Sequence, residues 1–158
     1  MSSLSVKRIG KDLQLVLESI KTSTDVDATK ARIISVTSES LYEWTVVSSA
    51  PANSIYGTLG HNYELAVLFS DDYPHEHPTV SFTTPIYSPL VTPDGNICEK
   101  LIESGWTPDQ HASDAIMLVL YKVFEDYAER CEADVHQEAR KCLELDPIEY
   151  EERVRHFH

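Results

Sequence analysis

The chain has 158 residues, 42% of them hydrophobic and 25% charged, which is ordinary for one globular domain. Its 26 acidic and 13 basic residues give a formal net charge of −13, which argues against nucleic acid and against anionic membrane surfaces as partners. No apolar run nears the roughly 20 residues that cross a bilayer, and the start, MSSLSVKRIGKDL, lacks the apolar core of a signal peptide. We therefore expect one domain, residues 1–158, located in the cytoplasm and/or the nucleus.

The three cysteines, Cys98, Cys131 and Cys142, have spacings that fit neither a disulfide framework nor a zinc site. An odd number of cysteines without a signal peptide is typical of a reducing compartment. Cys131 and Cys142 lie in stretches with helical periodicity among apolar neighbours. We therefore interpret both as small buried residues.

The first predicted element is a helix over residues 5–20. Apolar residues recur there at spacings of three and four and form one stripe, made of Val6, Ile9, Leu13, Val16 and Ile20. Lys7, Arg8 and Lys11 form a basic cluster in an otherwise strongly acidic chain. The cluster is either a solvated helix face or a docking patch.

Four strands are predicted next, because four stretches rich in β-branched and aromatic residues are each flanked by turn formers. They cover residues 31–37, 41–49, 62–70 and 79–84. The connections between them are short, which favours an antiparallel meander over a parallel sheet with crossovers.

After Pro108 the pattern becomes helical. A stripe through Ile116, Leu120, Val123, Tyr127 and Cys131 predicts a helix capped by Ser113 or Asp109, and two more helices are predicted over 135–145 and 147–157. The predicted fold class is therefore α+β, with an N-terminal helix, a four-stranded antiparallel meander, a long loop and C-terminal helices.

The long loop covers residues 85–108 and shows turn signals without strand-like alternation. Long irregular loops inside compact domains are uncommon unless they are functional or disordered. Because apolar anchors are spread along this one, we expect it to be ordered, packed and functional. The anchors are Ile86, Tyr87, Ile97, Leu101, Ile102 and Trp106.

Cys98 lies in this loop, after the turn Asp94-Gly95-Asn96 and before the charged pair Glu99-Lys100. Its thiol is either a small buried group or an exposed nucleophile. No histidine stands beside it in sequence, so a strongly activated, protease-type thiolate is not expected. Such a thiol suits a reaction whose partner brings its own activated acyl group.

Several anchors, taken in order and spacing, resemble the ubiquitin-conjugating enzyme family, whose members share the UBC fold. They are Lys7-Arg8-Ile9 with Leu13 in the first helix, Glu43-Trp44 in the second strand, Tyr73-Pro74 with Pro78, Val80 and Phe82, then Gly95-Asn96-Ile97-Cys98, and finally Trp106-Thr107-Pro108.

The resemblance implies that Cys98 accepts the C-terminus of ubiquitin, or of a ubiquitin-like modifier, as a thioester from an activating enzyme. A lysine amine then attacks this thioester, usually with the help of a ligase. A second conjugating-enzyme-like subunit is a further possible partner. No metal or organic cofactor is implied, because the activating enzyme consumes the ATP.

The same resemblance assigns roles to other residues. The residues expected to support the active-site loop are Tyr87, Ser88, Pro89, Leu90, Gly95, Asn96 and Trp106. Those expected to dock the activating enzyme are Lys7, Arg8 and Lys11. Those expected to face a ligase are His75, Pro108 and Asp109.

The sequence departs from the family pattern at the histidine-proline-asparagine site, which reads Ser88-Pro89-Leu90. The family's asparagine donates a hydrogen bond to the oxyanion or orders the loop, and Leu90 has no donor. Losing one oxyanion donor costs on the order of 3 kcal/mol, or roughly 100-fold in rate. Backbone N–H groups, Ser88 and Asn96 are the alternative donors.

Two further departures concern partners. His75 and Asp109 stand where the family usually has apolar Phe and Ala, so we expect weak binding to typical RING-type ligases. The family's acidic gate residue has no secure equivalent, and Glu129, Glu132 and Asp134 are each either that residue or part of a solvated face. His77 and His111 are interpreted as surface residues rather than bases. The chain is therefore interpreted as a divergent conjugating enzyme or, alternatively, as a non-catalytic variant that binds a modifier or assists another conjugating enzyme.

Overall fold

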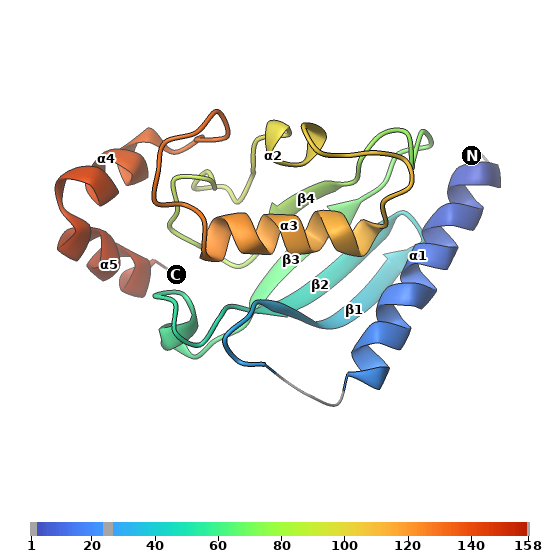
Figure 1. Cartoon of the computed structure of the whole chain (residues 1–158), viewed down its shortest axis with the longest axis horizontal. Coiled ribbons are helices and arrows are strands. Elements are labelled where there is room, and N and C mark those ends of the chain that lie inside the picture. Colours follow the sequence, from blue (N-terminus) through green and yellow to red (C-terminus); the bar gives the residue numbers. More distant parts are fainter. Residues whose placement is uncertain (1–2, 24–26, 158) are drawn as a thin grey trace.

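The computed structural model of the chain describes residues 3–23 and 27–157. Its elements in chain order are α1 (Ser3–Thr22), β1 (Arg32–Ser40), β2 (Glu43–Ser49), a short 3₁₀-helix (Gly57–Leu59), β3 (Tyr63–Leu68), β4 (Thr79–Phe82), α2 (Lys100–Glu103), α3 (Ala112–Phe124), α4 (Gln137–Leu145) and α5 (Pro147–His156). Figure 1 shows α3 lying across the sheet, α1 beside β1, and α4 with α5 at the opposite end. The predicted α+β class and element order are confirmed, although the 3₁₀-helix and α2 were not predicted.

The four strands form one antiparallel sheet in the order β1-β2-β3-β4. Side chains alternate across it, so that Tyr63, Leu65 and Val67 of β3 are buried while Glu64 and Leu68 are exposed. This period of two is what places every second residue of a strand on the same face. The sheet is therefore a meander with one face packed into the core, as the sequence predicts.

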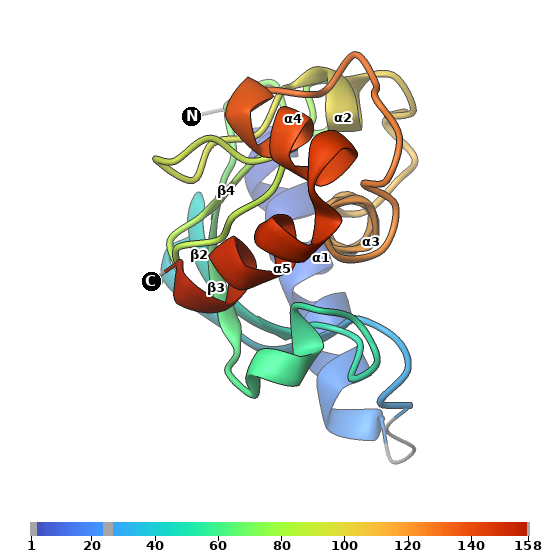
Figure 2. The ribbon, with the colours of Figure 1, turned by 90° about the vertical axis from the view of Figure 1, so that its left-hand side faces the viewer.

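The packed face is covered by α3, which Figure 2 shows nearly end-on beside the sheet. Seven residues of α3 are buried, at the spacings expected for a helix that packs on a sheet: Ala112, Ala115, Ile116, Val119, Leu120, Val123 and Phe124. The N-terminal helix α1 adds Ile9 and Val16 to the same core.

The predicted extension of α3 to Cys131 is wrong. The helix ends at Phe124, and Cys131 is exposed instead of buried. The carbonyls of Tyr127 and Ala128, which a continuing helix would use, instead accept hydrogen bonds from the Arg140 side chain at 2.8 and 3.1 Å. A contact with α4 therefore competes with helix propagation, and helical periodicity alone cannot reveal it.

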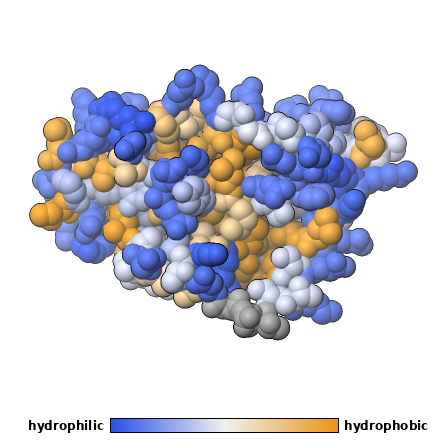
Figure 3. Space-filling model, viewed as in Figure 1, coloured by the Kyte–Doolittle hydropathy of each residue, from blue (hydrophilic) through white to orange (hydrophobic). Residues whose placement is uncertain are grey.

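The last two helices are joined at Asp146. Its side chain accepts a hydrogen bond from the N–H of Glu149 at 3.2 Å, and Pro147 occupies the first helical position, so α5 begins as predicted. Leu145 and Ile148 beside this junction are 83% and 79% exposed. Figure 3 shows hydrophobic colour at this end of the molecule and further hydrophobic colour across the middle of the same face.

No helix within residues 3–23 and 27–157 is long and apolar enough to cross a membrane. Among the same residues, no group of three or more His, Cys, Asp or Glu side chains is arranged to hold a metal ion.

Candidate active site

Cys98 lies on the long loop between β4 and α2, where it is half-buried against the core. Its carbonyl oxygen accepts a hydrogen bond from the N–H of Leu101 at 3.0 Å, which joins the cysteine to the first turn of α2. Leu101 and Ile102 are buried, so α2 is anchored in the core. This arrangement holds the cysteine partly exposed at the edge of the core.

Gly95 fixes the path of the chain toward Cys98. Its φ of 93° lies in the left-handed region that favours glycine, and a Cβ there would lie 2.0 Å from the carbonyl oxygen of Phe82. The N–H of Phe82 donates to the Gly95 carbonyl at 2.8 Å, and Asn96 pairs with Ser81 in an isolated bridge. The loop is thus fastened to β4 three residues before the cysteine.

Ser88, Pro89 and Leu90 form a buried turn. Leu90 is 1% exposed and packs in the core, and its N–H donates to the Ser88 hydroxyl at 3.1 Å. The Pro89 carbonyl accepts hydrogen bonds from the N–H groups of Val135 and His136 at 2.9 and 3.1 Å. Leu90 is therefore a packing residue, and backbone hydrogen bonds hold the turn in place.

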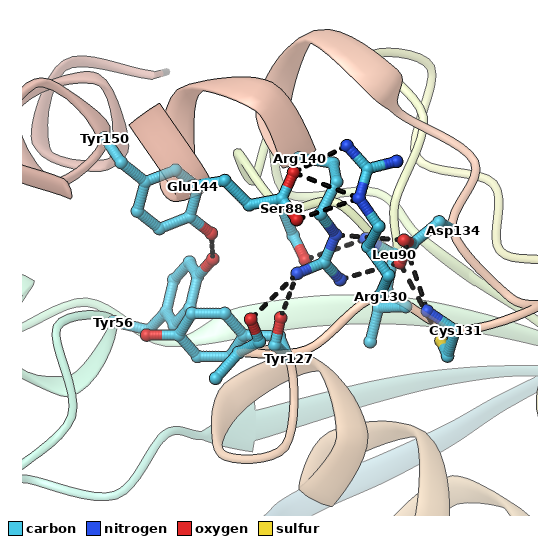
Figure 4. A network of polar contacts seen from close by, with 11 residues as sticks. Tyr56, Ser88, Leu90, Tyr127, Arg130, Cys131, Asp134, Arg140, Glu144 and Tyr150 are labelled. Carbon is cyan, nitrogen blue, oxygen red and sulfur yellow. Dashed lines mark hydrogen bonds and ion pairs between the residues drawn. The ribbon is translucent and has the colours of Figure 1, made fainter. Parts of the chain in front are cut away.

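Tyr87, directly before this turn, is held from the other side. Its carbonyl accepts a hydrogen bond from the Tyr56 hydroxyl at 2.6 Å, and the Tyr150 hydroxyl lies 2.6 Å from that of Tyr56. Figure 4 shows these two phenols meeting tip to tip. Burial raises the pKa of Tyr56 and of Tyr150 well above the usual range, so both stay protonated and able to donate. The buried turn is thereby fixed at both ends.

The segment after α3, residues 125–136, is called here the wall segment. With α2 and the end of α3 it borders a groove of about 530 Å³, called the α2 groove, which is lined by Lys100, Leu101, Glu103, Ser104, Lys122, Cys131, Glu132 and Ala133. Leu101, one of the residues that line the groove, donates its N–H to the Cys98 carbonyl at 3.0 Å, so the groove lies beside the turn that holds the cysteine.

Arg140 of α4 holds the wall segment (Figure 4). It is fully buried, and its Nε and Nη2 donate to the two carboxylate oxygens of Asp134 at 2.9 and 2.7 Å. The same carboxylate accepts a hydrogen bond from the N–H of Cys131 at 3.3 Å. Nearer the surface, Arg130 and Glu144 form a second ion pair between the wall segment and α4. The Arg130 hydrogen bonds lower the pKa of Glu144.

The three candidates for the family's acidic gate residue, Glu129, Glu132 and Asp134, lie in different environments. The Asp134 side chain is 6% exposed and paired with Arg140, so it points inward. Glu129 and Glu132 are both exposed, and Glu132 lines the α2 groove. Which of the three positions an incoming amine stays a prediction.

The predicted ligase-facing residues lie on one surface. The Trp106 indole N–H donates to the Pro74 carbonyl at 2.8 Å, which brings the Tyr73-Pro74-His75 turn beside the Trp106 loop. His75, Pro108 and Asp109 are exposed there. The Thr107 hydroxyl hydrogen-bonds to Asp109 and lowers the pKa of that carboxyl. The polar character expected of this surface is present, and its weak binding to RING-type ligases stays a prediction.

The basic cluster of α1 is divided between two environments. Lys7 and Lys11 are exposed and remain available for docking. Arg8 instead donates through Nη1 to the Pro108 carbonyl at 2.7 Å and through Nε to the Asp12 carboxylate at 3.2 Å. Arg8 therefore has an internal use, which joins α1 to the loop that leads into α3.

The start of α3 was assigned to the wrong residue by sequence reasoning. The residue that precedes the helix is His111, not Ser113 or Asp109, and its N–H donates to the Asp114 carboxylate at 2.8 Å. Its Nδ1 lies 2.7 Å from the Asp12 carboxylate. The Nδ1 atom of His77 lies 2.8 Å from the Pro78 carbonyl oxygen. These contacts are with residues other than Cys98, and His77 also lines a small hollow with Ile97 and Glu99.

Two residues that organise this region were missed by sequence reasoning, Asp12 and Arg140. Asp12 falls three residues after Ile9 and four before Val16, so a polar residue inside the apolar stripe was the available signal. Arg140 offered no comparable signal, because nothing in the sequence distinguishes it from the exposed Arg153 and Arg155 of α5.

Comparison with known proteins agrees with this geometry. The model of the family described as "Ubiquitin-conjugating enzyme" matches residues 8–158. A solved structure, "Ubiquitin conjugating enzyme (putative) from Trypanosoma cruzi", is 50% identical, with a TM-score of 0.93 over 98% of this chain and 99% of that chain. A structure from Plasmodium yoelii, with a TM-score of 0.75, is 17% identical and shows the fold alone.

Two curated relatives are more distant. "Probable ubiquitin-conjugating enzyme E2 31" of Arabidopsis thaliana is 34% identical over 83 residues, 52% of this chain and 53% of that protein, so the match spans about half of that relative's length. "Probable ubiquitin-conjugating enzyme E2 L460" of Acanthamoeba polyphaga mimivirus is 28% identical over 78% of this chain and 76% of that protein. Because the family model matches residues 8–158 of this chain, the chain belongs to the ubiquitin-conjugating enzyme family.

Proposed function

We propose that this protein carries ubiquitin or a ubiquitin-like modifier as a thioester on Cys98 and transfers it to a lysine amine. In the first step the Cys98 sulfur attacks the thioester carbonyl on the activating enzyme, a new C–S bond forms, and the activating enzyme's thiol leaves. In the second step a lysine amine attacks the Cys98 thioester. A C–N bond forms, the C–S bond breaks, the thiol is regenerated, and the amine gives up its proton.

The observation that carries the proposal is the placement of Cys98. The cysteine is half-buried, follows a glycine turn fastened to β4, and is bonded through its carbonyl to α2, which lines the adjacent groove. A nucleophile needs both access and a fixed position. A thiol with only a packing role would have no need for this arrangement at the protein surface.

Leu90 sets the limits of the proposed chemistry. Because its side chain is buried in the core, it neither donates to an oxyanion nor leaves room for a polar group. The Ser88 side chain is fully buried within the turn, so its hydroxyl is not exposed to an oxyanion at the protein surface. Asn96, exposed and two residues before Cys98, is the remaining side-chain donor among the alternatives. We expect thioester formation to be less affected than aminolysis.

The same observation favours one second candidate, a non-catalytic member that binds a modifier or assists another conjugating enzyme. Its case rests on the missing donor at position 90. Incubation with an activating enzyme, ATP and modifier, followed by gels with and without thiol, distinguishes the two. An adduct that thiol removes supports the enzyme. Modifier-induced NMR shifts without any adduct support the accessory protein.

A further inference from the structure

Arg140 holds the wall segment more completely than an ordinary surface ion pair would. Its guanidinium bonds both oxygens of Asp134 and the carbonyls of Tyr127 and Ala128, and it does so with no solvent exposure. Buried ion pairs require costly desolvation, and apolar residues of similar size often stabilise a fold equally well. The feature that an apolar contact of similar size would not supply is the fixed geometry that the pair imposes on the wall segment.

The contacts of Arg140 reach both ends of the part of the wall segment that faces the α2 groove. At one end they hold the carbonyls of residues 127 and 128. At the other they hold Asp134, whose carboxylate also accepts the Cys131 N–H at 3.3 Å. Between these points lie Cys131 and Glu132, both exposed and both lining the groove. The backbone position of Glu132 is therefore set by Arg140.

A second chain of contacts connects the wall segment to the turn before the active cysteine. Val135 and His136 follow Asp134 directly, and their N–H groups bond the carbonyl of Pro89. The arginine thus fixes, through Asp134, the side of the site that faces α2 and the cysteine loop.

We propose that Arg140 is a positioning residue for the transfer step, acting through Asp134 and the wall segment to place Glu132 at the groove that receives the lysine amine. The proposal rests on the proposed function of Cys98. Attack by the amine requires close alignment, and a displacement of about 1 Å can lower a rate on the order of 100-fold. Loading of Cys98 from the activating enzyme does not bring an amine into the groove, so it does not depend on this wall.

The test uses the full chain and three variants. Arg140→Lys keeps the charge but cannot form the forked contact with Asp134 together with both carbonyl bonds. The double variant Arg140→Met with Asp134→Leu removes both buried charges together, so that neither is left unpaired, and its urea unfolding curve is measured before discharge is compared. Arg155→Lys is the matched control, because the ion pairs of Arg155 with described residues are exposed and lie within α5, with Glu151 and Glu152.

Each variant is loaded with modifier in a single turnover and then discharged into free lysine over a range of concentrations, or into hydroxylamine. Hydroxylamine is small and needs no alignment by the wall. We expect loading and hydroxylamine discharge to be unchanged in all three. Lysine discharge should fall about 10-fold or more in the two Arg140 variants, with a higher half-saturating lysine concentration, and should be unchanged in Arg155→Lys.

Two results would overturn the positioning role. One is wild-type lysine discharge in the double variant. The other is an equal loss of lysine and hydroxylamine discharge, which would assign to Arg140 a general support of the cysteine loop. A wild-type chain that accepts no modifier would overturn the proposed function and the positioning role with it. This failure of the proposed function can be told apart from a failure of the positioning role alone, because the two results that overturn only the positioning role are obtained with a wild type that does accept modifier.

Discussion

The buried carboxylate of Asp12 on α1 accepts a hydrogen bond from the N–H of Ala112, the first residue of α3, at 3.1 Å. The same carboxylate is paired with Arg8 and lies 2.7 Å from the His111 ring nitrogen, and the Tyr73 hydroxyl donates to it. One side chain therefore joins the first helix, the Tyr73-Pro74 turn and the start of the central helix. These are the elements that support the surface around Trp106.

Replacing this carboxylate is expected to destabilise the whole domain. Asp12→Asn removes the charge and directs an amide N–H₂ toward groups that are themselves donors. We expect the free energy of unfolding to fall by about 3 kcal/mol, since hydrogen bonds to buried charges are among the stronger ones. Urea unfolding followed by circular dichroism measures the loss. Glu18→Gln on the exposed side of α1 is the control, and equal stability of the two variants would contradict this role of Asp12.

The loop before Cys98 is expected to depend on Gly95. Gly95→Ala places a Cβ against the Phe82 carbonyl at a φ that L-residues rarely adopt, so unfolding should become easier by roughly 1–3 kcal/mol. The matched control is Gly10→Ala in α1, where a Cβ meets nothing within 4 Å and should add up to about 1 kcal/mol of stability. Thermal unfolding of both variants checks the prediction. Stabilisation by Gly95→Ala would show that the turn can be made without glycine.

Restoring the family's asparagine at position 90 is expected to do harm. Leu90→Asn puts an amide into a site that is 1% exposed, so the free energy of unfolding should fall by about 2–4 kcal/mol. Lysine discharge from the loaded cysteine should not increase, because the side chain at this position faces the core. Leu145→Asn, at a site 83% exposed, is the control for stability. A faster discharge in Leu90→Asn would mean that position 90 can reach the oxyanion.

The buried tyrosines predict a loss of stability in alkali. Burial raises the pKa of Tyr56, Tyr63, Tyr73 and Tyr150 above the usual value near 10. The folded state therefore binds these protons more tightly than the unfolded state. This contribution to stability is complete below about pH 10 and is lost progressively as the pH rises above it.

The measurement is the melting temperature from pH 8 to pH 11.5, together with phenolate absorbance at 295 nm. The melting temperature should fall steeply above about pH 10, and part of the absorbance should appear only with unfolding. A melting temperature that is constant through this range, or complete ionisation of all tyrosines in the folded protein, would contradict the prediction.

Much of this fold is predictable from local patterns, because the packed side of each element has a regular period. The alternation in β3 and the stripe of Ile9 and Val16 in α1 follow directly from one-sided burial. The end of α3 is not predictable in this way, because the carbonyls just after it are bonded by a distant side chain. Arg140, which donates to the carbonyls of Tyr127 and Ala128, lies thirteen and twelve residues after them in the chain. Local periodicity carries no information about such a contact.

In the candidate site, too, some features could be predicted from the sequence and others could not. Gly95 and Cys98 are recognisable from their spacing, and the lack of an asparagine at position 90 is visible in the sequence. The burial of Leu90 and the inward turn of Asp134 are not visible, because each depends on which neighbours the folded chain brings close. The structure thus turns Asp134 inward and places Glu132 at the groove.

The most direct test of the central claim is the chemistry of the bond formed at position 98. Cys98→Ser should form an adduct with the modifier that resists thiol and is cleaved by hydroxide, as an ester is, while the wild type forms one that thiol removes. Cys131→Ser and Cys142→Ser should load like the wild type. Intact-protein mass spectrometry before and after each treatment measures whether the adduct is present on the wild type and on each of the three serine variants. A thiol-sensitive adduct that persists in Cys98→Ser, or the absence of any adduct on the wild type, would contradict the account.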